Sequence, residues 1–378
     1  ETETAFPKWS EMRLAAADPS RHYEVVNCGG VSYASYRIAI ILDEILSYSP
    51  DAIVIYTGHN EFLEERSYDT IAREDNPLLS ILGQSHLVRR IRDGLRPTTN
   101  DRQPLATALQ TRLDLVKGME RYVRDETWRR GVVEHFRITL GRMIQRCRQA
   151  DVPLILCVPT SDIVRTPPIK VLPKEMGDDS RARFETHWRI ARDQQESDTR
   201  RGKACEVCLE IDPHHAGAHY IAGKIYWNRM QTSKARTHLL AARDDDVCPL
   251  RATAPIIRQI VDAASELETE LVRCDHLFDQ TDALLRPLPD GIPDPQRFVD
   301  HIHPTIAGHQ EIAKVISDRL AEVFQIKPVA SAEDDYQAAS LRHLSTLDET
   351  YFARGKQRLE GLRNWASGRA GKLSVEMQ

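Results

Sequence analysis

The chain of 378 residues lacks several features that mark special classes of protein. It has no apolar run long enough to cross a bilayer, and its first residues do not have the pattern of a secretory signal peptide. It also has no basic surplus, since 51 lysines and arginines stand against 56 acidic residues and give a net charge of -5. That balance argues against nucleic acid as the main ligand, because a protein that binds nucleic acid needs an excess of lysine and arginine to neutralise the phosphates.

Cysteines are few and odd in number, with seven in the chain. The odd number and the apolar surroundings of Cys28 and Cys157 predict buried free thiols rather than a disulfide framework. Free thiols favour a reducing compartment. Cys205-Glu206-Val207-Cys208 has the spacing of half a zinc site, but no second pair or His-x-His partner stands at ligand spacing. We interpret it as a helix face and predict no metal ion.

The hydrophobic pattern predicts a parallel sheet with helices between its strands. Short apolar or β-branched runs that end in turn residues are expected to form buried strands. Helical patterns lie between them, and this alternation is typical of a doubly wound α/β domain. The predicted strands are 23–27, 52–56, 153–159 and 271–274, and the predicted helices are 35–47, 131–149 and 306–323.

Two other parts of the chain are predicted to be purely helical. Between about residues 181 and 243, Gly223, Tyr226, Ala235 and Ala242 fall at the small and aromatic positions of a tetratricopeptide repeat. Its two helices would be 218–228 and 233–243, and this unit of residues 181–250 is too short to stand without the main domain. After a polar linker, residues 336–378 form a tail with predicted helices at 336–347 and 349–366.

Asp300-His301-Ile302-His303-Pro304 is the first candidate for chemistry. A histidine that activates a hydroxyl needs a carboxylate to fix its tautomer and to stabilise the imidazolium. Two intervening residues allow Asp300 and His303 to form that pair within one tight loop. Taken alone, the pattern also fits a surface loop with incidental histidines.

Two further segments follow predicted strands. Asn60, after Gly58, would aim its side-chain amide at a developing oxyanion, although Gly58 and Asn60 also suit an ordinary turn. The adjacent His59 is an alternative candidate as a second base, but we prefer Asn60 as the residue that takes part in the chemistry. Gly29 and Gly30 would let backbone N–H groups approach a ligand, or they simply mark a strand-to-helix turn.

Together these three segments resemble the SGNH (GDSL-like) hydrolase superfamily. Residues 27–32 look like its second block, 58–60 like its third and 300–303 like its fifth. The closest likeness is to large bacterial members with a tetratricopeptide segment before the last block. The resemblance implies a flavodoxin-like three-layer α/β/α core, formed by residues 1–165 and 265–325, and hydrolysis of acyl esters. It implies no metal and no organic cofactor.

The same resemblance implies the roles of the site residues. His303 is the base and Asp300 its orienting partner, while Asn60 and the N–H of Ser32 or Gly30 form the oxyanion hole. The family has glycine where Ser32 stands, five residues after Asn27, so the register of the N–H donor is open. The third block often reads Gly-x-Asn-Asp, whereas Glu61 follows Asn60 here.

The largest departure is the serine nucleophile, which the family places after its first strand. Ser10 lies in a helical pattern without a preceding strand, and Ser32 and Ser35 lie in the oxyanion block. We therefore expect the nucleophile upstream of Glu1 and little esterase activity from these 378 residues alone. The protein would be cytoplasmic or tethered through such an upstream segment.

The substrate would be a small acyl ester, with acetylated carbohydrate or lipid as examples. The alternative is a catalytically silent core that presents its helical repeats to a protein partner. The missing serine and the repeat favour that alternative, whereas the presence of Asp300, His303 and Asn60 favours the enzyme.

Overall fold

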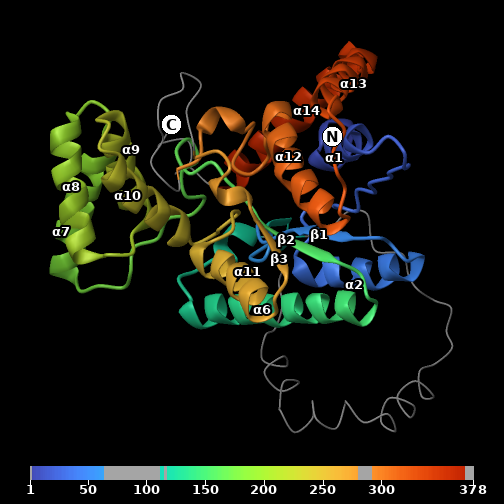
Figure 1. Ribbon diagram of the computed structural model, residues 1–378. Coiled ribbons are helices and arrows are strands. Elements are labelled where there is room, and N and C mark those ends of the chain that lie inside the picture. The colour runs from blue at the N-terminus through green and yellow to red at the C-terminus, as the bar shows by residue number, and fades with distance from the viewer. Residues whose placement is uncertain (1, 64–110, 115–116, 280–291, 371–378) are drawn as a thin grey trace, which may run out of the picture.

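A small parallel sheet lies at the centre of the molecule (Figure 1). The computed structural model describes residues 2–63, 111–114, 117–279 and 292–370, with side chains as far as residue 360. The strands are neighbours in chain order, and both pairs are parallel. They are β1 (Ile53–Tyr56), β2 (Leu154–Val158) and β3 (Glu270–Arg273). Three of the four predicted strands are therefore confirmed, and the chain has a mixed α/β fold.

The central strand β2 is buried along its whole length. Successive side chains of a strand point to opposite faces, so β2 serves two apolar clusters. Leu154, Leu156 and Val158 belong to one cluster, and Ile155 and Cys157 belong to the other. This alternation explains why the run 153–159 is apolar throughout, as expected for a strand covered on both faces.

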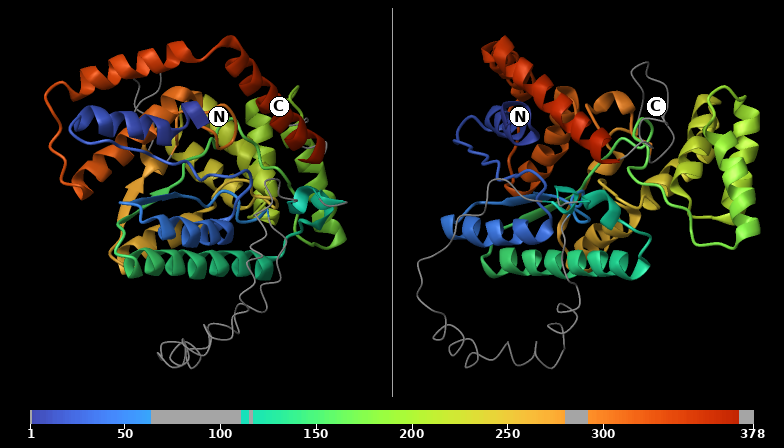
Figure 2. Two further views of the ribbon diagram at one scale, coloured as in Figure 1. Left: turned by 90° about the vertical axis from the view of Figure 1, so that its right-hand side faces the viewer. Right: turned by 180° about the vertical axis from the view of Figure 1, so that it is seen from behind.

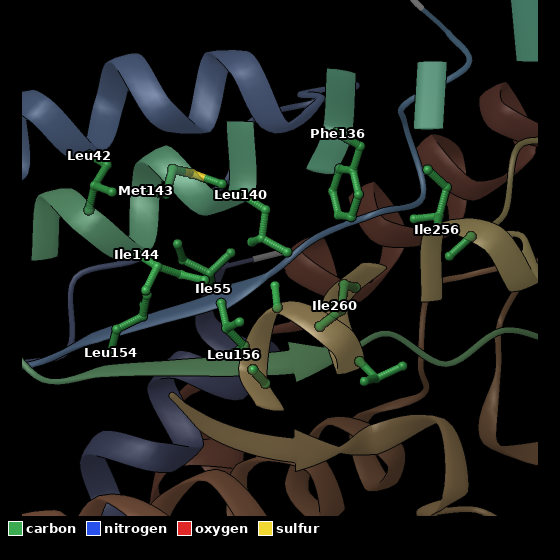
Figure 3. Packing of buried hydrophobic residues seen from close by; sticks show 14 of the residues in the cluster. Leu42, Ile55, Phe136, Leu140, Met143, Ile144, Leu154, Leu156, Ile256 and Ile260 are labelled. Atoms are coloured by element: carbon green, nitrogen blue, oxygen red, sulfur yellow. The ribbon is translucent and has the colours of Figure 1, made fainter. Parts of the chain in front are cut away.

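Three helices cover the first face of the sheet (Figure 1). They are α2 (Ser35–Ile45), α6 (Glu126–Gln149) and α11 (Ala254–Glu266). Figure 3 shows their apolar side chains packed with those of the strands, among them Leu140 and Ile144 of α6. In α6 the buried residues recur every three or four positions, and the Asp125 carboxylate caps the helix by accepting from Trp128 N.

Helices α1 (Phe6–Ala17) and α12 (Ile306–Val323) cover the opposite face. The tail continues through α13 (Ala332–Thr346), which packs on α1, and α14 (Glu349–Ala370). Short 3₁₀ helices occupy Thr2–Thr4, Leu46–Tyr48, Arg112–Asp114, Gly118–Arg121, Cys274–His276 and Pro295–Arg297. Among the described residues, no helix is both long and apolar enough to cross a membrane.

The helical unit forms a separate lobe beside the sheet (Figure 2). Its helices are α7 (Asp178–Arg192), α8 (Asp198–Ile211), α9 (Ala216–Asn228) and α10 (Thr232–Asp244), and each packs on the next. A Cβ atom on Gly223 would lie only 2.8 Å from Leu239 Cγ. The predicted close approach of these two helices is therefore confirmed.

The predicted strand at Tyr23–Asn27 is wrong, because this segment belongs to no sheet. Its backbone bonds to a helix side chain instead, since Val25 N donates to Glu11 Oε2 at 3.1 Å. Val26 is 70% exposed. The β-branched pattern predicted strand propensity, but a strand also needs a neighbour with free backbone groups, and β1 is an edge of the described sheet without pairing to this segment.

The prediction for the thiols is confirmed in part. All seven cysteines are free and six are buried, including Cys157, but Cys28 is exposed. The apolar neighbours of Cys28 predict burial. This prediction is wrong for Cys28, because the segment before it forms no strand of the sheet. Cys205 and Cys208 are buried in α8, where burial raises the pKa of both thiols to about 12.

Two substitutions in α2 test the packing of its inner face. Leu42 is 3% exposed in the core cluster, whereas Ile40 is 49% exposed. We expect Leu42→Ala to lower the free energy of unfolding by about 2–5 kcal/mol, because it leaves a cavity. Ile40→Ala should change it by less than about 0.5 kcal/mol. Urea unfolding measures both, and equal effects would contradict this arrangement of α2.

Candidate active site

The Asp300 to His303 loop forms a hydrogen-bonded pair. One carboxylate oxygen of Asp300 accepts from the backbone N–H groups of Ile302 and His303, at 2.9 and 2.8 Å. The other oxygen lies 2.7 Å from His303 Nδ1. Because a carboxylate accepts, the proton of the neutral imidazole is on Nδ1, and Nε2 carries the lone pair.

The hydrogen bonds of the loop stabilise the ionised form of Asp300. Its side chain is 9% exposed, and burial by itself would raise the pKa of the carboxyl. The hydrogen bond and the charge of His303, together with His301, outweigh that effect and bring the pKa of Asp300 below its usual range. The His303 side chain is 53% exposed, so the imidazole is accessible from solvent.

Backbone contacts fix the position of the loop. Val299 N donates to His303 O at 2.9 Å, and Phe298 and Pro304 form an isolated antiparallel bridge. At the same loop, Asp162 N donates to His301 O at 3.0 Å, which ties the loop to the chain leaving β2. The Asp300–His303 pair therefore lies at the carboxyl edge of the sheet.

Helix α12 begins directly after this loop. The Thr305 side chain caps it by accepting from Gly308 N at 3.2 Å. A Cβ atom on Gly308 would meet Arg297 O at 2.8 Å, so glycine permits the close approach of helix and loop. The helix therefore anchors the loop.

The turn after β1 brings Asn60 to the 30–33 turn. Gly58 has a φ of +124°, which favours glycine. Asn60 is half-buried, and its Nδ2 donates to Tyr33 O at 3.1 Å. A side-chain amide has two N–H donors, so one remains for another acceptor.

The 30–33 turn has a left-handed residue at Ser32, with a φ of +62°. Such a conformation is uncommon for residues other than glycine. Gly30 lies against the ring of Tyr33, where a Cβ atom would collide with the ring carbons. Both candidates for the N–H donor therefore lie in the turn that Asn60 contacts.

Glu61 has a structural partner. Its carboxylate accepts from Ser35 N at 2.9 Å and from Ser35 Oγ at 2.8 Å, at the first turn of α2. A carboxylate at a helix N-terminus is stabilised by the unpaired N–H groups there. Glutamate rather than aspartate after Asn60 thus serves to hold α2 against the β1 turn.

His59 is a residue that sequence reasoning passed over. It is 8% exposed, and its Nδ1 accepts from Ala252 N at 3.1 Å, so the ring proton is on Nε2. That nitrogen is buried, and the ring also interacts with the backbone of Thr160. Burial, then the charges of His301 and His303, lower the pKa of His59 to about 3. It is a neutral imidazole within electrostatic reach of the Asp300 loop.

None of the serines considered from the sequence is bonded to His303 in the part of the chain that the structure describes. Ser10 is 2% exposed within α1, and Ser35 is fully buried on Glu61. Ser32 lies in the turn described above. Across those same residues, no group of three or more His, Cys, Asp or Glu side chains could hold a metal ion.

Comparison with known proteins gives no relative. No protein-family model, curated protein or solved structure matches the chain. The chemical interpretation of the site therefore depends on its own geometry.

Acid should destabilise the protein through its buried histidines. Burial lowers the pKa of five imidazoles to about 3 or 4, namely His59, His215, His238, His301 and His309. The unfolded imidazoles have pKa values of about 6.5, so the unfolded chain takes up protons first as the pH falls. We expect the free energy of unfolding to decrease steadily from about pH 7 towards pH 4.

Urea unfolding at several pH values measures this slope. His59→Asn keeps an oxygen that can accept from Ala252 N but does not titrate, so the variant should lose less stability on acidification than the parent. Identical slopes for the two proteins would contradict a neutral buried His59.

Proposed function

We propose that this chain forms most of an SGNH-type (GDSL-like) serine ester hydrolase that acts on small acyl esters. The observation that carries the proposal is the Asp300–His303 pair, with a 2.7 Å bond to Nδ1 and a His303 side chain that is 53% exposed. It lies within electrostatic reach of His59, which precedes Asn60, at the edge of a parallel sheet where ligands of α/β proteins bind.

In the proposed reaction, His303 Nε2 takes the proton of a serine hydroxyl as the serine oxygen attacks the ester carbonyl. Asp300 stabilises the imidazolium that forms. When the tetrahedral intermediate collapses, the ester bond breaks and His303 gives its proton to the leaving alcohol. Water then attacks the acyl-serine with His303 again as base, and the acid and the free serine are released.

The oxyanion would be held by the second N–H of Asn60 and by a backbone N–H of the 30–33 turn. The left-handed φ of +62° at Ser32 supports the alignment in which Ser32 replaces the glycine of the family.

The serine is proposed to precede residue 1, at the end of a strand next to β1. Two contacts support this position. The Phe6 ring lies 5.6 Å from that of Tyr56 and 6.4 Å from that of His309, so the beginning of α1 lies beside the end of β1 and the start of α12. A strand leading directly into α1 would end at the same edge of the sheet as the Asp300 loop.

The edge of the sheet supports the same position. Tyr23 and Val25 pack against the same apolar cluster as Val54 and Tyr56 of β1, although they form no strand. A strand inserted between the 23–27 segment and β1 would give both of them the backbone partner that each lacks on that side among the described residues. The sheet would then have the flavodoxin-like order of the family.

The helical lobe supports the finer part of the resemblance. Gly223, Ala235 and Ala242 lie where α9 and α10 meet, and the last two are 0 and 1% exposed. Such small residues at the crossing are typical of tetratricopeptide helices. In the proposed enzyme this lobe lies beside the site. Acetylated carbohydrate and acetylated lipid are examples of substrates for the enzyme.

Hydrolysis of p-nitrophenyl acetate tests the proposal. With the upstream sequence present, we expect turnover that His303→Ala lowers by a factor on the order of 10⁴ or more. Asn60→Ala should lower kcat by a factor of about 10² to 10³ through loss of an oxyanion donor. The 378 residues alone should show little activity.

The matched control is His22→Ala, which removes an exposed histidine away from these turns and should leave kcat unchanged. Robust turnover by the 378 residues that disappears in His303→Ala would refute an upstream nucleophile. A longer protein that no fluorophosphonate labels would refute the hydrolase.

Hydrogen exchange tests the proposed strand separately. We expect the amides of residues 23–27 to exchange rapidly in the 378-residue chain and to become protected when the upstream sequence is present. The amides of α6 serve as the internal control, because their protection should be equal in both proteins. Unchanged exchange at 23–27 would contradict an inserted strand.

The alternative is a silent core that binds a protein partner through its helical lobe. The observation in its favour is the groove between α8 and α9, which includes Gly202, Ile225 and Tyr226. The fluorophosphonate experiment separates the two functions, since a scaffold would carry no reactive serine.

A further inference from the structure

A second polar site lies on the other side of the chain that leaves β2. A cavity of about 370 Å³ opens between α10, α11 and the carboxyl ends of β2 and β3. This volume is within the range of small-molecule sites, and the ends of parallel strands are where such sites form. Neither His303 nor Asn60 lines the cavity, so it is distinct from the candidate active site.

Each of the two helices presents one face to the cavity. Arg236, Leu240 and Arg243 follow one another along α10 at spacings of four and three residues. On α11, Ile257 and Arg258 also line the cavity, four and three residues before Val261. Arg273 enters from the end of β3. The lining thus combines four arginines with an apolar wall.

Two of these arginines are neutralised by neighbouring carboxylates. Arg243 lies 2.9 Å from Asp244, and Arg273 makes two bonds to Asp275 at 2.8 and 2.7 Å. A ligand would meet little net charge from these pairs.

The other two, Arg236 and Arg258, form no ion pair within the part of the chain that the structure describes. Arg236 is half-buried, and its Nε is shielded from solvent without an acceptor among those residues. Arg258 is exposed. The cavity therefore has two guanidinium groups without a countercharge there, beside a wall of aliphatic side chains.

We propose that this cavity binds an organic phosphate. A guanidinium group donates two parallel hydrogen bonds to phosphate oxygens, and a phosphate monoester carries about two negative charges at neutral pH. That charge matches the two arginines without partners, whereas a carboxylate would compensate only one. The aliphatic residues Leu240, Ile257 and Val261 would contact the organic part of the ligand.

The proposal does not rest on the hydrolase, because the cavity and the Asp300 loop have separate linings. The backbone bond from Asp162 N to His301 O joins the segment between them to that loop. A ligand in the cavity would contact the same segment through Thr160 and Ser161.

Calorimetric titration of the 378-residue chain tests the proposal with three probes: phenyl phosphate, inorganic phosphate and benzoate. We expect phenyl phosphate to bind most tightly, because it has both the charge and the apolar group. Benzoate, with the same ring and a single charge, should bind about tenfold more weakly or worse. Equal affinity for phenyl phosphate and benzoate would overturn the proposal.

Variants locate the bound anion. Arg258→Glu and Arg236→Ala should each weaken binding of phenyl phosphate by about tenfold or more, because each removes a charged donor. Arg258 is exposed on α11, so its substitution should leave Tm unchanged and keep the test valid if Arg236→Ala unfolds the chain. Arg342→Glu, an exposed arginine of α13, is the matched control and should bind as the parent does.

Unaltered binding in Arg258→Glu would overturn the proposal. Loss of binding in His303→Ala with binding kept in Arg258→Glu would also overturn it, because the anion would then lie at the Asp300 loop. Retained binding in His303→Ala together with weakened binding in Arg258→Glu supports the cavity.

Discussion

The backbone hydrogen bonds of β2 to both of its neighbours are made where water has no access. All five residues of the strand are buried, and an unpaired peptide group there would cost about as much as a lost hydrogen bond. The bonds to β1 and β3 therefore fix the register of the sheet. The side chains of β2 in turn hold α6 and α11 on one face and α1 and α12 on the other.

The segment that follows β2 connects the central strand to the Asp300 loop. Asp162 is 1% exposed, and its carboxylate accepts from Val164 N and Arg165 N. Its carbonyl accepts from Arg251, which is also buried. Because its own N–H bonds to His301 O, the Asp300 loop takes its position from the central strand. One buried, hydrogen-bonded segment thus separates the candidate active site from the arginine-lined cavity.

Buried carboxylates also hold the helical lobe to the segments that connect it with β2 and α6. Burial raises the pKa of Asp246 to about 6, although its carboxylate accepts from the N–H groups of Ile169, Lys170 and Cys248. Arg124 donates to the nearly inaccessible carboxylate of Asp212 at 2.6 Å. Removing one partner of such a buried pair would leave the other charge uncompensated and would destabilise the fold. These bonds therefore fix the position of the lobe.

The amino-acid sequence by itself determined the features that depend on neighbours in the chain. The period of apolar residues predicted three strands and the bounds of α12, and the spacing of Asp300 and His303 predicted their pair. Such features arise within a few residues, where geometry follows from the local pattern. The wrong strand prediction at 23–27 also follows from this limit. A strand forms only when a second strand lies beside it, and the local sequence does not show whether that neighbour is present.

Only the tertiary structure decided the features that need distant segments. The tautomer of His59 depends on Ala252 N, and Glu61 finds its partner in Ser35. The cavity combines arginines from α10, α11 and β3, whose spacing along the chain gives no sign of a common site. Their proximity is a consequence of the order of the strands and of helix packing, which place them together although no short-range pattern connects them.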